Sequence, residues 1–271
     1  MNSVQSFLRS SKIFQGDAKY LIDKIKGDIK WKRNCKVLDV GCGPGNYTHD
    51  VLLPILPQST TVVIGVDKWP EAIDYANSNY GKFGDILFKE MDIAHEQNTN
   101  YHTYFDHVFS FDRLQSVGLQ ETALRNIRKM LKPGGDFFFS CAANLNLFDI
   151  YSFMSKKDKW RSYLANYTKD MPPYKYSRHP KESLREELLK VEFQEVHIEI
   201  VPNRCVIPLA LYPEFITSRI PFPIPPQLKS AFVFSSLQAL KELKFDKFID
   251  GEEVYVLEMQ GIYGHVTRRR I

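Results

Sequence analysis

The strongest chemical signal in the sequence is a glycine-rich turn directly after a predicted buried strand. Alternate glycines occur in the segment Val37-Leu38-Asp39-Val40-Gly41-Cys42-Gly43-Pro44-Gly45, and a helix is expected to start near Asn46 or Tyr47. Glycine lets the backbone approach a ligand closely. A dinucleotide site would have the spacing GxGxxG, whereas this spacing is GxGxG. Asp39 would repel a pyrophosphate and suits a ligand with an ammonium or sulfonium. Taken alone, the motif is equally consistent with a tight turn.

Acidic residues follow two more predicted strands. Asp67 ends the second strand, where a carboxylate can accept hydrogen bonds from both hydroxyls of a ribose. Asp92 follows the third strand and can accept from an adenine amino group, while Ile93 packs on the ring and Lys68 and Trp69 wall its other face. Each acid alone is more often a helix cap or a solvated turn. Because parallel strands bring their carboxyl ends to one edge, the three acids together predict a ligand site there.

The elements that position these residues have the pattern of an α/β fold. Short β-rich runs alternate with helical stretches from Lys36 to about Ala142, which predicts a parallel sheet with crossover helices. The strands are expected at Lys36–Val40, Thr61–Val66, Ile86–Glu90, Asp106–Phe111, Asp136–Ala142, Glu192–Val201 and Glu253–Ile262, with helices at Pro70–Asn79 and Gln120–Met130. We interpret residues 1–271 as one domain, in which residues 143–190 and 202–250 are insertions that form a substrate lid.

These motifs resemble those of class I methyltransferases that use S-adenosylmethionine (SAM). The likeness is carried by VLDVGCGPG, GVDKWPEAIDYA, MDI, FDHVFSF and MLKPGGDFFFS, between Lys36 and Cys141. It implies a Rossmann-like seven-stranded sheet, with its last strand antiparallel and helices on both faces. It also implies cofactor contacts in which Asp39, Gly41, Cys42, Gly43 and Gly45 border the methionine part, Asp67 holds the ribose, Asp92 and Ile93 hold the adenine, and Ser110 and Phe111 present backbone to the methionyl amine. Lys132–Gly135 would be a turn before the fifth strand.

Nearly the whole chain is similar to the juvenile hormone acid methyltransferases of insects, which methylate the carboxylate of lipophilic isoprenoid acids. The similar segments include Lys30–Lys32, Phe105–Phe111 and Phe148–Tyr151. That family has a Gln near its N-terminus that reaches the substrate carboxylate, and Gln15 is the nearest match here. It also has a His-Trp pair in the loop after the fourth strand, where this chain has Gln115-Ser116 within the altered loop Asp112–Gly118. Gln115 can donate to a carboxylate, or it can be an ordinary surface glutamine.

The predicted chemistry asks little of side chains. Methyl transfer from a sulfonium is a direct displacement, and a carboxylate is already deprotonated at pH 7, so no general base is required. Alignment and a dry pocket are required instead. Aromatic and aliphatic side chains are abundant in both insertions, and we assign about half of them to ordinary packing and the rest to a pocket for a lipophilic acid: Phe148, Tyr151, Phe153, Trp160, Tyr163, Tyr167, Leu209, Leu211, Tyr212, Phe215, Phe222, Phe232 and Phe234.

A hydroxyl or amine acceptor would instead require a general base to remove its proton, and the histidines give no clear candidate for that base. His107 is expected to be packed within the fourth strand, and His179 lies in a turn. No acidic partner can be recognised from sequence for the other five: His49, His95, His102, His197 and His265. The alternatives to a carboxyl methyltransferase are therefore an enzyme acting on a phenol or amine, or a binding protein for SAM or an apolar ligand that has lost turnover.

Composition and charge disfavour several other classes. The net charge of +4 is mild and the basic residues are spread along the chain, so no nucleic-acid partner is expected. Met171–Tyr174 with the preceding Asp170 echoes the Asp-Pro-Pro-Tyr motif of base methyltransferases but lies far from the fourth strand, and we treat it as coincidence. Arg268–Arg270 reads as a solvated tail. We expect a cytoplasmic protein without a membrane span, with four reduced cysteines and no metal. The sequence is silent on oligomeric state.

Overall fold

The structure, a computed structural model, describes residues 4–11, 15–27, 29–81, 86–95, 101–118, 120–218, 220 and 222–270. Two compact units divide the chain. The sheet unit comprises Gln15–Cys141, Ser177–Val201 and Gly261–Ile271. The helical unit comprises Met1–Phe14, Ala142–Tyr176 and Pro202–Gln260, which includes most of both predicted insertions. That these insertions serve as a lid stays a prediction.

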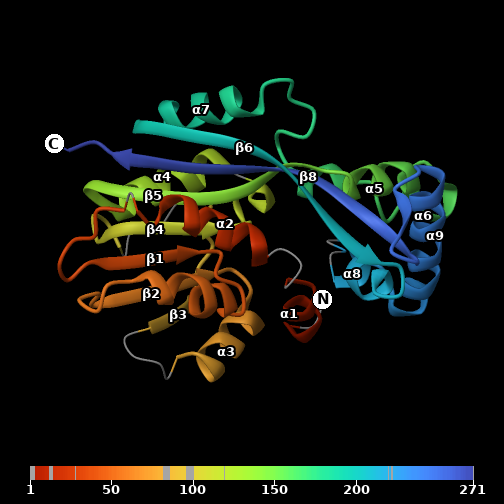
Figure 1. Cartoon of the computed structure of the whole chain (residues 1–271), viewed down its shortest axis with the longest axis horizontal. Coiled ribbons are helices and arrows are strands. Elements are labelled where there is room, and N and C mark those ends of the chain that lie inside the picture. The colour runs from red at the N-terminus through yellow and green to blue at the C-terminus, as the bar shows by residue number, and fades with distance from the viewer. Residues whose placement is uncertain are drawn as a thin grey trace. The chain divides into compact units, whose positions relative to one another are not determined.

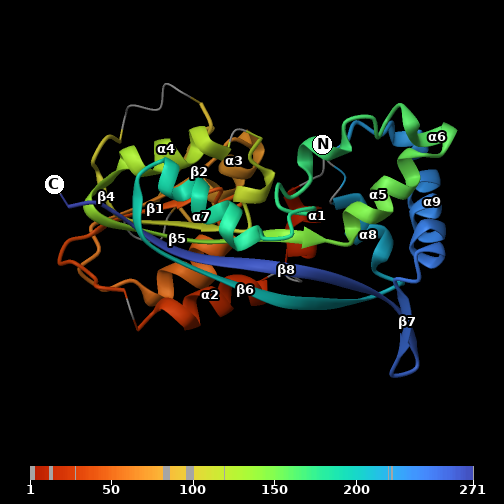
Figure 2. The same ribbon diagram turned by 90° about the horizontal axis from the view of Figure 1, so that it is seen from above.

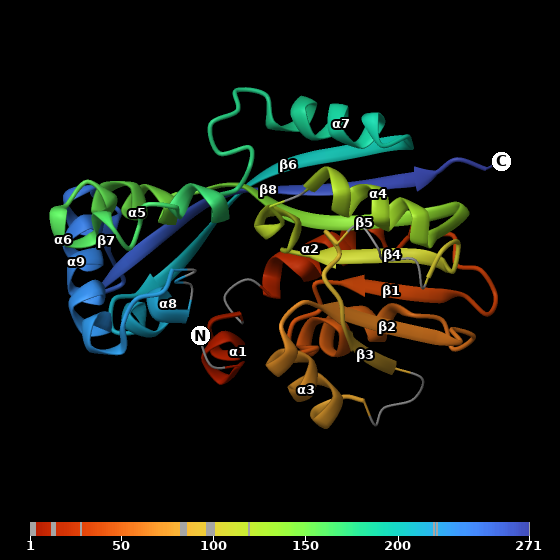
Figure 3. The same cartoon turned by 180° about the vertical axis from the view of Figure 1, so that it is seen from behind.

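The sheet has the strand order β3-β2-β1-β4-β5-β8-β6, which can be followed in Figures 1 and 3. Its parallel pairs join β1 to β2 and β4, β2 to β3, and β4 to β5. Within the sheet unit, β8 runs against β5 and β6 (Figure 1). The strands are β1 (Lys36–Val40), β2 (Val62–Asp67), β3 (Ile86–Glu90), β4 (Phe105–Phe111), β5 (Leu131–Leu145), β6 (Phe193–Pro208), β7 (Asp246–Ile249) and β8 (Glu252–Arg268). The predicted α/β sheet with an antiparallel last strand is confirmed.

Helices cover both faces of the sheet, with α2 on one face and α3, α4 and α7 on the other (Figure 2). The central strand β4 is buried along its whole length, as a parallel strand covered on both faces must be. The predicted apolar face of Gln120–Met130 is confirmed, because Ala123, Ile127 and Met130 are buried. The helices of the sheet unit are α2 (Gln15–Ile25), α3 (Pro70–Asn79), α4 (Gln120–Met130) and α7 (Pro180–Lys190).

Three strands are longer than the sequence predicted. The turn at Lys132–Gly135 lies inside β5, because Leu131 pairs with Phe105 and the next paired residues are Asp136 and His107. Residues 132–135 therefore bulge out of the ladder, and Gly134 has φ +70°. β6 and β8 also continue beyond their expected ends. The short strand β7 was missed, although Asp250 and Gly251, both with positive φ, form a two-residue hairpin turn that the Asp-Gly pair favours.

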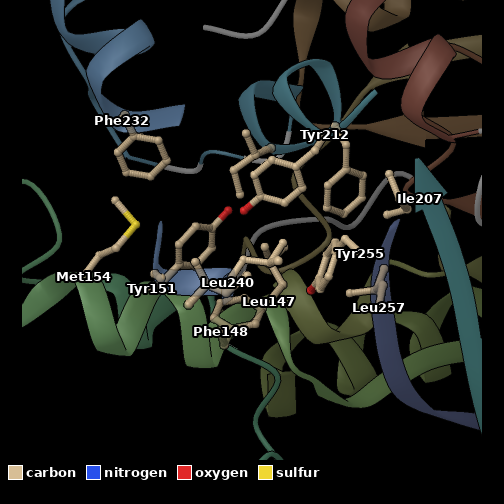
Figure 4. Close-up of a cluster of buried hydrophobic side chains, with 14 of the residues drawn as sticks. Leu147, Phe148, Tyr151, Met154, Ile207, Tyr212, Phe232, Leu240, Tyr255 and Leu257 are labelled. Atoms are coloured by element: carbon tan, nitrogen blue, oxygen red, sulfur yellow. The ribbon is translucent and has the colours of Figure 1, made fainter. Parts of the chain in front are cut away.

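The helical unit has its own apolar core, shown in Figure 4. Its helices are α1 (Val4–Ser11), α5 (Leu147–Ser155), α6 (Asp158–Arg161), α8 (Tyr212–Ser218) and α9 (Lys229–Glu242). Tyr151, Trp160, Tyr212 and Phe232 are almost completely buried there. Asn146 ties the end of β5 to β8, since its Nδ2 donates to the Val256 carbonyl and its Oδ1 accepts from the Tyr255 hydroxyl at 2.7 Å. A buried amide with these bonds satisfied stabilises the unit.

Candidate functional site

The glycine turn after β1 can be formed only by residues without a side chain. Gly41, Gly43 and Gly45 have φ of +76°, +53° and +83°. A Cβ on Gly41 would overlap the side chain of Arg113, and one on Gly45 would come within 2.9 Å of the Phe88 ring. Since both positive φ and close contact exclude other residues, the turn exposes bare backbone at the carboxyl end of β1. A glycine cradle of this kind fits the approach of a ligand.

Asp39 lies beneath this turn and is only 1% exposed. Its Oδ2 accepts a hydrogen bond of 2.6 Å from the Thr48 hydroxyl. Burial raises the pKa of Asp39 to about 7, although the Thr48 bond and the charge of Arg113 act in the opposite direction. A helical segment begins at Asn46, as the sequence predicted, and its residues Thr48–Leu52 form a π-helix. Such π-helical turns occur often at functional sites, and this one delivers the hydroxyl to Asp39.

Asp67 connects the end of β2 to the same turn. Its two oxygens accept backbone hydrogen bonds from Gly43 at 2.9 Å and from Trp69 at 3.0 Å. Each carboxylate oxygen has two acceptor positions, so both can still accept from ligand hydroxyls. The two backbone bonds fix the orientation of the carboxylate at the edge of the sheet. Its predicted contact with ribose is consistent with this placement but is not tested by it.

The predicted adenine residues lie after β3. Asp92 is exposed, and its Oδ1 accepts from the backbone N–H of Ala94 at 2.9 Å, whereas Ile93 is buried. The sequence reasoning missed Asn126 of α4, which is 3% exposed and donates through Nδ2 to the carbonyls of Ile93 and His95, both at 2.8 Å. Asn126 thus holds the loop that carries Asp92 against α4.

The other predicted cofactor residues divide by burial. Lys68 is exposed and Trp69 is half-buried at the start of α3. Cys42 is buried, and burial raises the pKa of its thiol, so it packs as a small apolar residue. Ser110 and Phe111 are buried too, and the Ser110 hydroxyl donates to the Val40 carbonyl at 2.9 Å. Because that hydroxyl is engaged, the part of Ser110 that can serve a ligand is its backbone.

The loop after β4 contains a cation that sequence reasoning missed. Arg113 lies over Gly41, with its Nε donating to the Gly41 carbonyl at 3.1 Å. It follows Asp112, whose φ of +52° is rare for a residue with a side chain and marks a backbone held against its preference. Its charge also lowers the pKa of buried Asp39. A signal was present in the sequence, because an arginine directly after the fourth strand falls at the ligand edge of the sheet.

Of the two glutamines proposed from the family resemblance, the structure describes the side chain of Gln115 but not that of Gln15. Gln115 folds back on its own loop, where Nε2 donates to the Asp112 carbonyl at 2.8 Å. Its Oε1 is buried without a hydrogen-bond donor among the described residues. Gln15 is the first residue of α2, but its side chain lies outside the described residues. Neither contact with a substrate carboxylate is tested, and both stay predictions.

The structure supplies acidic partners that the sequence did not reveal for the histidines. His265 lies 3.0 Å and His107 3.3 Å from the carboxylate oxygens of Asp136, and His49 lies 2.8 Å from Asp50. His107 is fully buried in β4, as predicted. Asp136 follows the bulge near the start of β5, which is the end of the sheet away from the glycine turn. Its two histidines are therefore not placed as bases at the predicted ligand edge.

Other kinds of site find no support in the described part of the chain. There, no group of three or more His, Cys, Asp or Glu side chains is arranged to hold a metal ion. Among the same residues, no helix combines the length and the apolar character that a membrane crossing requires.

Comparison with known proteins agrees with this geometry. Residues 31–195 match the family described as "Methyltransferase domain". The chain is 28% identical over 246 residues to a juvenile hormone acid O-methyltransferase of Bombyx mori, covering 90% of this chain and 88% of that protein. It is 30% identical over 204 residues to the protein of that name from Drosophila melanogaster, covering 74% and 68%. The fold resembles the YcgJ protein of Bacillus subtilis, with a TM-score of 0.61 and 11% identity, covering 93% of this chain and 99% of that one.

Proposed function

The chain belongs to the methyltransferase domain family, and from this premise we propose that it transfers a methyl group from SAM to the carboxylate of a lipophilic acid. The observation that carries the proposal is the extent of the likeness to two juvenile hormone acid O-methyltransferases, which reaches 90% of this chain. A likeness limited to the cofactor segment would support methyl transfer alone. SAM supplies an electrophilic methyl on its sulfonium.

The residues at the carboxyl edge suit the charges of SAM. Asp67 lies beside the glycine turn, Asp39 lies beneath it and ionises near neutral pH, and Arg113 carries positive charge over Gly41. SAM has a positive sulfonium and ammonium and a negative carboxylate. We assign the ammonium and sulfonium to the field of Asp39, the ribose to Asp67 and the adenine to Asp92 and Ile93. Arg113, whose fork suits a carboxylate, then holds the methionyl carboxylate.

The helical unit supports an apolar acceptor. Packing in its core accounts for six of the thirteen apolar side chains named from the sequence, close to the half that we expected. Phe148, Tyr151, Trp160, Tyr212, Phe215 and Phe232 are buried in its core, so packing accounts for them. Five more of these side chains are half-buried and border the core, and we assign them to the pocket for the lipophilic acid: Phe153, Tyr163, Tyr167, Leu209 and Phe222. Leu211 and Phe234 are exposed.

Three tyrosine hydroxyls lie within the buried part of this cluster, and that of Tyr255 is bonded to Asn146 while the other two come from Tyr151 and Tyr212. Those of Tyr151 and Tyr212 point toward one another (Figure 4). Burial raises the pKa of Tyr212, so it stays a neutral hydroxyl and cannot serve as a base at neutral pH. A carboxylate acceptor needs no base, so a neutral, mostly apolar surrounding is compatible with it.

The test is a panel of acceptors incubated with methyl-labelled SAM. Farnesoic acid, juvenile hormone acid and fatty acids of graded length are compared with phenols and amines. Ester formation that rises with the apolar length of the acid supports the proposal. Methylation of phenols or amines but not of acids contradicts the carboxylate assignment and favours an enzyme for another small molecule. Tight binding of SAM without any product identifies a binding protein that has lost turnover.

The cofactor assignment is tested separately from the acceptor. Asp67→Ala removes the carboxylate that Gly43 and Trp69 hold, and SAM affinity measured by calorimetry should fall by about tenfold or more. Asp74→Ala, an exposed acid on α3, is the matched control and should bind normally. Unchanged affinity of Asp67→Ala would remove this residue from the site.

A further inference from the structure

A hollow with a volume of about 1250 Å³ lies within the sheet unit. It is lined by the end of α2, the segment before β1, α7, and parts of β5, β6 and β8. Lys30 and Lys32 precede β1, and Gly134 and Asp136 lie near the start of β5. The glycine turn follows the opposite end of β1. The hollow, which we call the basic cavity, is therefore distinct from the cofactor site.

The lining of the basic cavity is rich in positive charge. Eight of its residues are basic and three are acidic, which leaves a clear excess of cations. The basic residues come from three separate parts of the chain: Lys24, Lys30, Lys32, Lys181, Arg185, Arg268, Arg269 and Arg270. This corrects the impression from the sequence that basic residues are spread out, because the fold gathers them. Cations converging on a hollow concentrate positive potential there.

Part of this charge already has partners. Lys24 pairs with Glu199 at 3.5 Å and Lys32 with Asp106 at 3.4 Å. Arg185 donates to the Val196 carbonyl, and Arg268 donates to the carbonyls of residues 128, 129 and 131. For the other four cations, the described residues supply no ion pair: Lys30, Lys181, Arg269 and Arg270.

The three C-terminal arginines, Arg268–Arg270, line the basic cavity. Arg268 is anchored to the end of α4, so this residue does not belong to a frayed tail, as the sequence suggested. The side chain of Arg270 lies over Gly134, with its Cγ 2.9 Å from where a Cβ would be. Arg269 and Arg270 are exposed. Two exposed cations are thus attached to an anchored strand end at the rim of the cavity.

One of the three acidic residues in the lining, Asp136, lies against two imidazole rings. The Asp136 oxygens face His265 at 3.0 Å and His107 at 3.3 Å. Burial opposes its ionisation, but the bonds to both histidines prevail and lower its pKa to about 2. His197 stacks against His265 with ring centroids 6.1 Å apart. Asp136 is therefore ionised at neutral pH and carries one negative charge, and the eight basic residues of the lining still outnumber its three acidic ones.

We propose that the basic cavity binds a ligand bearing phosphate groups. Lysine and arginine side chains from several elements can surround a multiply charged phosphate, and the arginine fork matches its oxygens. The volume exceeds what a single carboxylate fills and is sufficient for a small molecule. A hollow fits a compact ligand better than a nucleic-acid duplex, which needs an extended basic face. The phosphate can belong to a soluble compound or to a lipid head group.

The decisive variant is K30Q/R269Q/R270Q, which removes three exposed cations and leaves the anchoring Arg268 in place. Its matched control is K129Q/K159Q/K247Q, which has the same loss of charge at exposed lysines outside the cavity lining. Inorganic pyrophosphate is titrated by calorimetry at low and at physiological salt. Phosphatidylcholine vesicles with and without a phosphoinositide are tested in a sedimentation assay.

We expect the wild type and control to bind one of the phosphate probes, with affinity that falls as salt rises. The cavity variant should bind at least about tenfold more weakly, with circular dichroism and S-adenosylhomocysteine affinity unchanged. Binding of pyrophosphate identifies a soluble ligand, and binding only to phosphoinositide vesicles identifies a head group. The proposal is overturned if the wild type binds neither probe, or if the control loses as much affinity as the cavity variant.

Discussion

The two ends of the same sheet present opposite chemistry. At the carboxyl ends of β1 and β2, Asp39 and Asp67 are fixed by short bonds from Thr48, Gly43 and Trp69. At the other end, exposed lysines and arginines from distant parts of the chain surround the basic cavity. The first region is preorganised by backbone, so single changes should be costly. The second relies on long side chains in solvent, so its effects should be distributed and sensitive to salt.

The largest effect is expected at Gly41. Gly41→Ala places a Cβ on a residue with φ +76° and against Arg113, so both the turn and the arginine must shift. Affinity for S-adenosylhomocysteine, measured by calorimetry, should fall by about a hundredfold or more, since backbone approach to the ligand is lost. Gly27→Ala, where a Cβ meets nothing within 4 Å, is the control and should bind normally. Equal affinity of both variants would show that the turn is not preorganised for the ligand.

The carboxyl edge of the sheet could be predicted from the sequence better than the basic cavity. Asp39 and the three glycines lie within seven residues of one another, and parallel strands bring Asp67 and Asp92 to the same edge of the sheet. The local sequence pattern was therefore sufficient to predict this region. Arg113 was missed because its contact with Gly41 depends on how the loop after β4 folds over the glycine turn. Asn126 was missed because it acts through the carbonyls of another loop, which no motif records.

The basic cavity could not be predicted in the same way. Lys30, Lys181 and Arg270 are far apart in sequence and come together only when α2, α7 and β8 pack. The two histidines beside Asp136 could not be predicted either, because His107, Asp136 and His265 lie on three different strands, β4, β5 and β8. The aromatic insertions show a different limit. The expected division into about half packing agrees with the six of thirteen side chains that fill the core, but composition cannot tell which six these are.

A smaller effect is expected at Arg113, and it separates the two ends of the cofactor. Arg113→Gln should weaken S-adenosylhomocysteine about thirtyfold, because a charge-assisted hydrogen bond to the methionyl carboxylate is lost. Methylthioadenosine lacks that carboxylate and should bind both proteins equally. The two affinities are measured in parallel, with Arg125→Gln on α4 as the control. An equal loss for both ligands would mean that Arg113 supports the turn and does not contact the carboxylate.

The pH dependence of SAM binding should be milder still. The pKa of Asp39 is about 7 without ligand, and a cationic ligand favours the ionised carboxylate, so binding lowers that pKa and releases a proton. SAM affinity therefore rises with pH through 7 and falls as Asp39 becomes protonated, by about fivefold between pH 7 and pH 6. Calorimetry in buffers of different ionisation enthalpy measures the released proton. Asp39→Asn, which keeps the acceptor for Thr48, should flatten this profile, and an unchanged slope would assign the titration to another group.

The smallest effect on the cofactor is expected from the opposite end of the sheet. Arg268 donates to the carbonyls of Arg128, Lys129 and Leu131, at and just beyond the end of α4, where acceptors lack helical partners. Arg268→Gln should lower the free energy of unfolding by about 1–2 kcal/mol in a urea titration, while S-adenosylhomocysteine affinity stays unchanged. Arg269→Gln, an exposed neighbour, should have no measurable effect on stability. A loss of cofactor affinity in Arg268→Gln would show that the two ends are coupled through β4 and β5, and that the separation on which the comparison rests is wrong.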